Sequence, residues 1–400
     1  MRITESILTL LPISAAAARF KAADTAGSDR LAGIALHNVA QDSGNAPSKR
    51  QYRPHGPAPD SYSSDRPCTV ETASIRREWD TLCPDEKRAY IKAVQCLLEK
   101  PSISGDLVPG ARSRYDDFLG THINQTLTIH GTGNFLSWHR YFTWTYEQAL
   151  RKECGYKGVF PYLNWPKYAL DLLNAPVFDG SDTSMSGNGE WDPRNNGTWV
   201  PNEQAKNIKI PAGSGGGCVK TGPFANMTVR LGPVAPALSY ATPNPQKDGL
   251  GYNPRCLRRD MSAYAAEKWA NDDQIVDLLS NSSDLLTFQN TLQGNFPAGF
   301  LGAHTAGHFI VGGDPGGDLF TSAGDPYFFL QHAQIDRVWW IWQNQCPGRI
   351  DIIAGQTQFG VPNSTYTTLD DVIELGVNAK GIKIKDAVDT LKGPFCYIYE

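Results

Sequence analysis

The chain has 400 residues, of which 40% are apolar and 10% aromatic, so it can bury one large core and is not an intrinsically disordered protein. Its 37 basic and 41 acidic residues give a net charge of −4, which provides no strongly basic surface for nucleic acid or an anionic membrane and favours a small neutral ligand. The 38 glycines and 27 prolines gather in the middle of the chain, which predicts long ordered loops around a mainly helical centre.

The N-terminus has the features of an export signal. Arg2 precedes an apolar run over residues 7–13, and the alanines at 15–18 offer a small-residue cleavage site. Residues 1–18 are therefore predicted to be a signal peptide.

A polar segment follows the predicted signal. Residues 19–66 show no sustained periodicity and contain the dibasic pair Lys49-Arg50, which predicts a pro-segment over residues 19–50 and one catalytic domain over residues 51–400. An ordinary polar tail with a chance dibasic pair is the alternative.

The cysteines and sequons agree with export. With an even number of cysteines and no CxxC pair, disulfides are the default and no free thiol is expected, although eight cysteines allow 105 pairings. No segment has the roughly 18 apolar residues that a membrane-spanning helix needs, so a soluble secreted protein is expected. The cysteines are Cys68, Cys83, Cys96, Cys154, Cys218, Cys256, Cys346 and Cys396, and the sequons begin at Asn124, Asn196, Asn226, Asn281 and Asn363.

Apolar periodicity predicts most of the secondary structure as helix. Glycine, proline, asparagine and serine dominate residues 174–260, which are expected to form loops pinned by Cys218 and Cys256. Helices are expected in two stretches of residues 71–100 separated at Cys83-Pro84, and over residues 113–123, the amphipathic run after Gly133, and residues 261–270, 272–292 and 325–343.

Six of the eight histidines fall in these helical regions or beside them. They form two groups of three, His122, His130 and His139, and His304, His308 and His332, while the other two are His37 and His55. His304 and His308 are four residues apart, so on a helix their imidazoles project from one face as ligands of one metal. Asp336 follows His332 by one helical turn and is a candidate hydrogen-bond acceptor or helix-orienting group behind it.

The spacing within the first group requires a break in the helix. Nine residues separate His130 from His139 and would place them on opposite sides of a continuous helix. Gly131 and Gly133 supply the break, so His130 is expected to precede the helix that carries His139. Three imidazoles per site, without carboxylate or thiolate, suit copper or zinc, and the Irving–Williams order favours copper.

These motifs resemble the type-3 copper family of tyrosinases and catechol oxidases. The resemblance covers residues 65–399 and rests on His130-x8-His139-Arg140 and on His304-x3-His308 with His332-x3-Asp336. It implies a central four-helix bundle with two copper ions, one on each histidine triple. It also implies oxidation of small phenols, o-diphenols to o-quinones, with dioxygen as co-substrate reduced to water.

Two departures from the family pattern concern the frame of the site. Many members carry a cysteine just before the second ligand, joined to a ligand by a thioether, but residues 127–129 contain none. The motif Tyr397-Ile398-Tyr399 is followed only by Glu400, so the C-terminal shielding domain of many relatives is not expected here.

A third departure concerns the substrate. Members that hydroxylate monophenols often have a glutamate upstream of the second copper site, and no Asp or Glu lies between Leu285 and Ala303, so monophenol hydroxylation is expected to be weak or absent. By position in the family, Thr305, Phe309 and Leu319 are expected around the substrate. A leucine gate at 319 predicts an open entrance for bulkier or aminophenolic substrates.

Three alternative functions remain open from the sequence. A tyrosinase with full monophenolase activity and an oxygen-binding protein of the hemocyanin kind would carry the same paired triples, and a zinc hydrolase would use three histidines. The oligomeric state is not set by the sequence.

Overall fold

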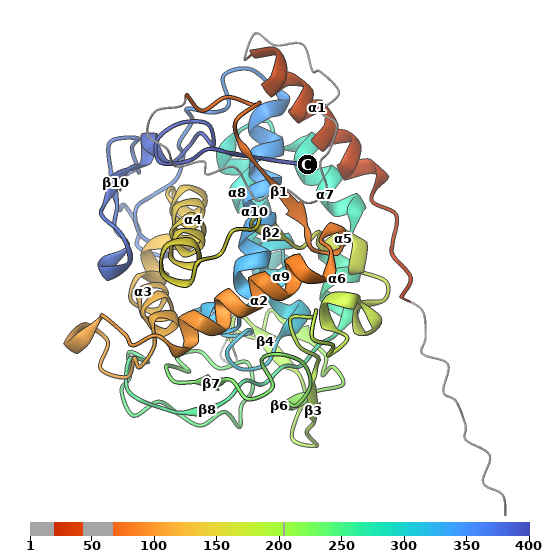
Figure 1. The fold of residues 1–400 in the computed structure, drawn as a ribbon, viewed down its shortest axis with the longest axis vertical. Helices are drawn as coiled ribbons and strands as arrows, with labels where there is room; N and C mark the ends of the chain where they lie inside the picture. Colours follow the sequence, from red (N-terminus) through yellow and green to blue (C-terminus); the bar gives the residue numbers. More distant parts are fainter. Residues whose placement is uncertain (1–19, 43–66, 203–204) are drawn as a thin grey trace, which may run out of the picture.

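The computed structural model describes residues 20–42, 67–202 and 205–400. The predicted signal peptide and the pair Lys49-Arg50 lie outside these residues. The described chain is mainly helical, as predicted, and four helices form its centre, with α10 running through the middle of the molecule (Figure 1). These helices are α3 (Arg114–Ile129), α4 (Phe135–Cys154), α9 (Ala303–Val311) and α10 (Tyr327–Gln345).

Local sequence signals explain where the central helices begin and end. The Ser113 side chain accepts the N–H of Asp116, whose carboxylate accepts the N–H of Ser113, so a capping box starts α3. Gly155 ends α4 in the left-handed conformation (φ 69°). Helix α10 starts after Asp325-Pro326 and is buried from Tyr327 to Gln343, which explains why apolar residues occur all round it.

Shorter helices surround this centre. The helix expected over residues 272–292 is divided in two, because Asp284 caps a new helix by accepting the N–H of Thr287 (2.9 Å). The remaining helices after the N-terminal one are α2 (Pro84–Glu99), α5 (Trp165–Tyr168), α6 (Ala263–Trp269), α7 (Asp272–Asn281) and α8 (Leu285–Gln293).

The segment before Cys83 is a strand, so the prediction of a helix there is wrong. Strand β1 (Ser74–Glu78) lies between β2 (Pro161–Tyr162) and β11 (Tyr397–Tyr399) and is parallel to both. Its arginines are buried because distant carboxylates pair with them: Arg76 lies 2.8 Å from Glu147 on α4. Long-range pairing of this kind overrides the local periodicity.

The glycine-rich middle of the chain forms loops with short two-stranded sheets, in agreement with the loop prediction. The disulfide Cys218–Cys256 joins two of these strands. The strands are β3 (Gly189–Trp191), β4 (Thr198–Val200), β5 (Ile208–Ile210), β6 (Gly216–Val219), β7 (Thr228–Val229) and β8 (Arg255–Cys256), followed near the end of the chain by β9 (Val372–Ile373) and β10 (Ile382–Lys383).

Two further disulfides tie distant segments together. Cys96–Cys154 joins α2 to the end of α4, and Cys68–Cys396 joins the segment before β1 to the residue before β11. Cys83 and Cys346 are unpaired, so the prediction of no free thiol is wrong. The even number of cysteines does not mean that all of them pair. The two unpaired cysteines lie at the ends of different helices, Cys83 before α2 and Cys346 after α10.

Thiol titration of the denatured, unreduced protein is therefore expected to detect two thiols per chain. Cys346 is exposed, so it should react in the folded protein as well, and Cys346→Ser should leave one thiol after denaturation. A count of zero in the wild type would contradict this pairing.

The segment predicted to lack periodic structure contains a helix, which is a further correction. Helix α1 (Ala26–Asp42) lies along α10 and α7 at the outside of the molecule (Figure 1). Leu31, Ala35 and Val39 recur at helical spacing on its buried side, and the helix forms because this narrow apolar stripe packs on the domain. The Asp272 carboxylate also accepts the N–H of Gly27 at 3.1 Å.

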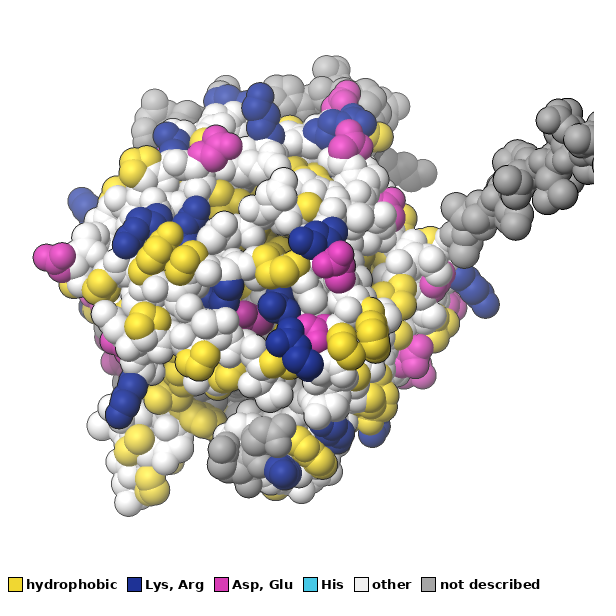
Figure 2. Space-filling model, turned by 90° about the horizontal axis from the view of Figure 1, so that it is seen from below, with side chains coloured by type: hydrophobic (Ala, Val, Ile, Leu, Met, Phe, Trp, Pro, Cys, Tyr) yellow, Lys and Arg dark blue, Asp and Glu magenta, His cyan; other side chains and the backbone are white. Residues whose placement is uncertain are grey.

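The surface carries both signs of charge. On the face shown in Figure 2, basic and acidic side chains are interspersed with apolar ones. Among the helices of the described residues, none is both long and apolar enough to cross a bilayer.

Candidate metal centre

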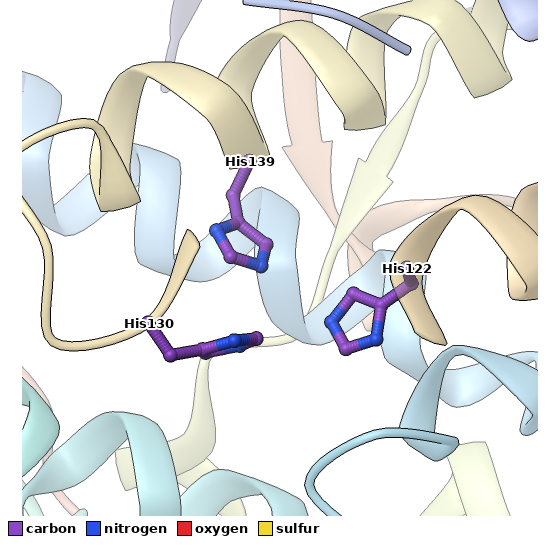
Figure 3. Close-up of side chains that lie close together, drawn as sticks. All are labelled: His122, His130 and His139. Carbon is purple, nitrogen blue, oxygen red and sulfur yellow. The ribbon is translucent and has the colours of Figure 1, made fainter. Parts of the chain in front are cut away.

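Three histidines from α3, the loop after it and α4 converge on one point (Figure 3). One ring nitrogen from each lies within 4.8 Å of those of the other two, and all three side chains are buried. His122 lies in α3, His130 directly follows α3 in extended conformation, and His139 lies in α4. Gly131 turns the chain with φ 63°, so the predicted glycine break places His130 opposite His139.

Each imidazole of this triple is oriented by a main-chain carbonyl. Because a carbonyl only accepts, these bonds place the proton on Nδ1 and leave the Nε2 lone pairs for a metal. The three Nε2 atoms are buried and have no hydrogen-bond partner in the described chain. The donors and acceptors lie 2.8–2.9 Å apart: His122 donates to Phe320, His130 to Thr126 and His139 to Phe135.

The second triple joins α9 to α10. Ring nitrogens of His304, His308 and His332 lie within 4.8 Å of one another. The Nε2 atoms of His304 and His308 are 3.1 Å apart, as expected for residues one turn apart on a helix. Both nitrogens of His332 are buried without a partner among the described residues.

The two triples adjoin each other and are surrounded by aromatic side chains. The rings of His139 and His332 stack with centroids 4.5 Å apart and planes 15° apart. The Phe135 ring lies 5.0 Å from that of His139 and 4.9 Å from that of His304, and Phe328 lies 4.1 Å from His332. These contacts fix the imidazoles and keep water away from them.

The six histidines of the two triples are neutral at pH 7. Burial is the main cause and lowers the pKa of all six, to about 4 for His130 and about 3 for His308, so protons do not compete with a metal for the lone pairs. A buried polar group without a partner costs about 1–3 kcal/mol, so bound ions would stabilise the unpartnered nitrogens. The imidazole donor set of each triple therefore fits copper or zinc.

Asp336 lies behind the second triple and connects three elements. Its carboxylate accepts from Arg140 of α4 at 2.5 Å, from Arg76 of β1 at 3.3 Å and from the hydroxyls of Tyr397 and Tyr399 of β11 at 2.6 Å. Burial alone would raise the pKa of Asp336, but the two arginines outweigh it and hold that pKa below its ordinary value. Of the two roles predicted for Asp336, its contacts match the one of orienting helices, because His332 has no hydrogen-bond partner among the described residues.

A cavity of about 260 Å³ lies beside both triples. Thr305 and Leu319 line it, as two of the three predicted substrate contacts, whereas Phe309 lies in the core beside a separate small cavity near Gly312. The other lining residues are Thr126, Leu127, His130, Gly131, Asn290, Gln293, Gly294, Phe296, His304 and Phe359.

Gln293 is a cavity residue that sequence reasoning missed. Its side-chain oxygen accepts the N–H of Gly131 at 2.7 Å, and the Thr305 hydroxyl donates to its main-chain oxygen at 2.9 Å. Gln293 thus links the loop after His130 to the start of α9. No spacing motif in the sequence identifies Gln293, because α8 comes close to the histidines only in the folded chain.

The sequence model described as the common central domain of tyrosinase matches residues 112–345, a range that contains all six histidines of the triples. The chain is 46% identical to the tyrosinase-like protein orsC of Emericella nidulans over 69% of this chain and 75% of that protein. It is 37% identical to the N-acetyl-6-hydroxytryptophan oxidase ivoB of the same organism over 83% of this chain and 94% of that protein.

A solved structure shares this fold. The structure of a polyphenol oxidase from Thermothelomyces thermophila superimposes with a TM-score of 0.82 at 39% sequence identity, covering 94% of this chain and 97% of that chain. The similarity therefore extends well beyond the helices that carry the histidines.

Proposed function

Because this chain belongs to the tyrosinase family, we propose that it oxidises o-diphenols, including o-aminophenol analogues, and hydroxylates monophenols weakly or not at all. Its membership makes it a copper-dependent oxidoreductase acting on small phenols, with a type-3 dicopper site. His122, His130 and His139 would hold one copper ion, and His304, His308 and His332 the other.

Two groups of residues prepare the site for this chemistry. When bound, the copper pair supplies the redox chemistry that passes electrons from the diphenol to dioxygen. The carbonyl-bound imidazoles keep their tautomers fixed, and Phe135 and Phe328 exclude water from the space between the triples. Each o-diphenol loses two electrons and two protons to become an o-quinone, so two diphenols reduce one dioxygen to two waters.

The residues that line the cavity support the proposed preference of the enzyme for o-diphenols. Of the described residues that line it, none is aspartate or glutamate, and the side chains of Thr126, Asn290, Gln293 and Thr305 are not bases at neutral pH. The two histidines of the lining, His130 and His304, would be occupied as metal ligands. Both substrate classes must lose phenolic protons, but a monophenol must also be hydroxylated, and a positioned base contributes about 10²–10⁴-fold to a step of that kind. The open cavity also favours an enzyme over an oxygen carrier.

The mouth of the cavity supports substrates larger than catechol. Leu319 lines the cavity and is 41% exposed, so its side chain does not close the entrance. The relative ivoB is named for oxidation of a hydroxylated tryptophan, whose phenolic ring carries one hydroxyl and is fused to a second ring, so its name supports the size of the substrate and not the preference for o-diphenols. The cavity itself, at about 260 Å³, is smaller than the about 300–1,000 Å³ that encloses drug-sized ligands, so a substituent would extend outwards.

Secretion is part of this proposal. Three disulfides join described segments, as is typical of proteins from oxidising compartments. The sequon residues Asn124, Asn196, Asn226, Asn281 and Asn363 are all exposed and available for glycosylation.

Metal analysis and oxygen uptake test the proposal together. The purified protein should hold two copper ions per chain and no zinc. Oxygen uptake should be rapid with 4-methylcatechol and 2-aminophenol, and slower by at least about 100-fold with 4-methylphenol, because no carboxylate base is among the described residues that line the cavity.

Each alternative gives a different result. Comparable uptake with 4-methylphenol would replace the proposal by a full tyrosinase activity. Reversible oxygen binding without uptake on either o-substrate would indicate an oxygen carrier, and zinc in place of copper would revive the hydrolase.

A further inference from the structure

A hairpin from the C-terminal part of the chain is docked on the loop that carries His130. Within residues 355–367, the N–H of Thr357 donates to the carbonyl of Thr365 at 2.9 Å and closes the hairpin. Two main-chain bonds attach the hairpin: Phe359 N–H donates to the carbonyl of Leu127 in the last turn of α3 at 3.0 Å, and Gly133 N–H of the loop donates to the carbonyl of Gln356 at 2.8 Å. It therefore holds a fixed position beside the metal centre.

The Phe359 side chain lies at the mouth of the cavity. It lines the cavity, and its ring packs so closely on Gly131 that a Cβ on that glycine would collide with it. The ring is nevertheless 54% exposed. An aromatic side chain fixed in place and half open to solvent presents a ready-made stacking surface, because it loses little conformational freedom when a ligand covers it.

Two more apolar side chains complete the rim. Leu127 and Leu319 line the same cavity and are 52% and 41% exposed. Single exposed apolar residues are common, but three at one cavity mouth form a patch of the kind that marks a binding site. Asn290 and Gln293 lie on the cavity wall contributed by α8, so the rim is apolar and this wall offers amides.

We propose that Phe359 determines specificity by stacking on an aromatic substituent of the diphenol. This inference rests on the proposed function and names its substrate class: catechols that carry a second aromatic ring or a broad apolar group opposite the hydroxyls. The oxidisable ring enters the cavity beside the triples, and the substituent lies against Phe359 and the rim leucines. The contact binds substrate and takes no part in electron transfer.

The test compares catechol with its 4-phenyl derivative in one set of variants. Phe359→Ala should lower the ratio of kcat/KM for the phenyl derivative to kcat/KM for catechol by about tenfold, chiefly because the phenyl derivative binds less tightly and its KM rises. Phe359→Tyr keeps an aromatic ring and should restore the ratio to within about twofold of the wild type. Val361→Ala is the matched control, because Val361 is exposed on the same hairpin but does not line the cavity, and its ratio should equal that of the wild type.

The outcomes separate this inference from the function on which it rests. An unchanged ratio in Phe359→Ala, or equal losses for both catechols with normal copper content, would overturn the role of Phe359 while leaving the oxidase assignment intact. A wild-type protein that oxidises neither catechol would instead contradict the proposed function. Phe359→Leu adds a check on stacking: if it matches the wild-type ratio, bulk and not the aromatic ring sets the preference, and the proposal fails.

Discussion

Substitution of His332 by alanine is expected to lower catechol oxidation by at least about 100-fold, because a catalytic metal ion supplies several kcal/mol and tenfold in rate corresponds to about 1.4 kcal/mol. His332 is the only member of its triple on α10, and both its nitrogens are buried without a partner among the described residues. Its removal leaves two imidazoles for the second ion, so copper content should fall from two to about one per chain. Oxygen uptake and metal analysis of one preparation measure both effects.

His37→Ala, measured on the uncleaved chain that still contains α1, is the matched control for this variant. His37 is an exposed histidine of α1, where it contacts Gln41 at 2.9 Å, and it belongs to neither triple. Its replacement should change neither copper content nor uptake. Retention of most activity in His332→Ala would refute the assignment of the second triple.

Asp336→Asn is expected to destabilise the protein by about 3–5 kcal/mol, the cost of leaving buried arginines without their counter-charge. The side chain is buried and accepts from Arg140 and Arg76 as well as from Tyr397 and Tyr399. An amide of the same shape cannot accept from all four donors and carries no charge. Urea unfolding monitored by tryptophan fluorescence at pH 7 measures the loss.

The pH dependence of this effect has a defined sign. The folded-state pKa of Asp336 lies below its ordinary value, so its stabilising contribution is fully present above the unfolded pKa of about 3.9 and is lost as the pH falls through the folded pKa. The difference between wild type and Asp336→Asn should therefore shrink in strong acid. Asp370→Asn, which removes an exposed carboxylate paired with Lys383 and Lys385, should have no measurable effect, and a comparable loss there would contradict the burial argument.

The metal centre could be predicted from the sequence because its geometry is mostly local. The i, i+4 spacing of His304 and His308 and the glycine after His130 encode their relative directions within a few residues. The walls of the cavity could not be predicted in this way. Gln293 and Phe359 reach it from a separate helix and from a hairpin, and their sequence neighbourhoods contain no repeating pattern.

The failed predictions share a physical cause, which is dependence on distant partners. Strand β1 consists mostly of charged residues and is buried only because Glu147 and Asp336 neutralise Arg76. The cysteine count predicted complete pairing, but which thiols meet depends on the assembled fold, and Cys83 and Cys346 do not. In each case the local sequence fits another structure equally well until the partner is in place.

The position of helix α1 affects the predicted removal of the pro-segment, because cleavage of the chain would not by itself release the helix. The helix packs its apolar stripe on the domain, donates N–H groups to Asp272, and bonds through Asn38 to the carbonyl of Asn344 at 2.8 Å. Hydrolysis of the chain after Arg50, as the dibasic pair predicts, breaks none of these contacts. The severed peptide would then be a noncovalent subunit, and its departure would follow a dissociation equilibrium that depends on protein concentration.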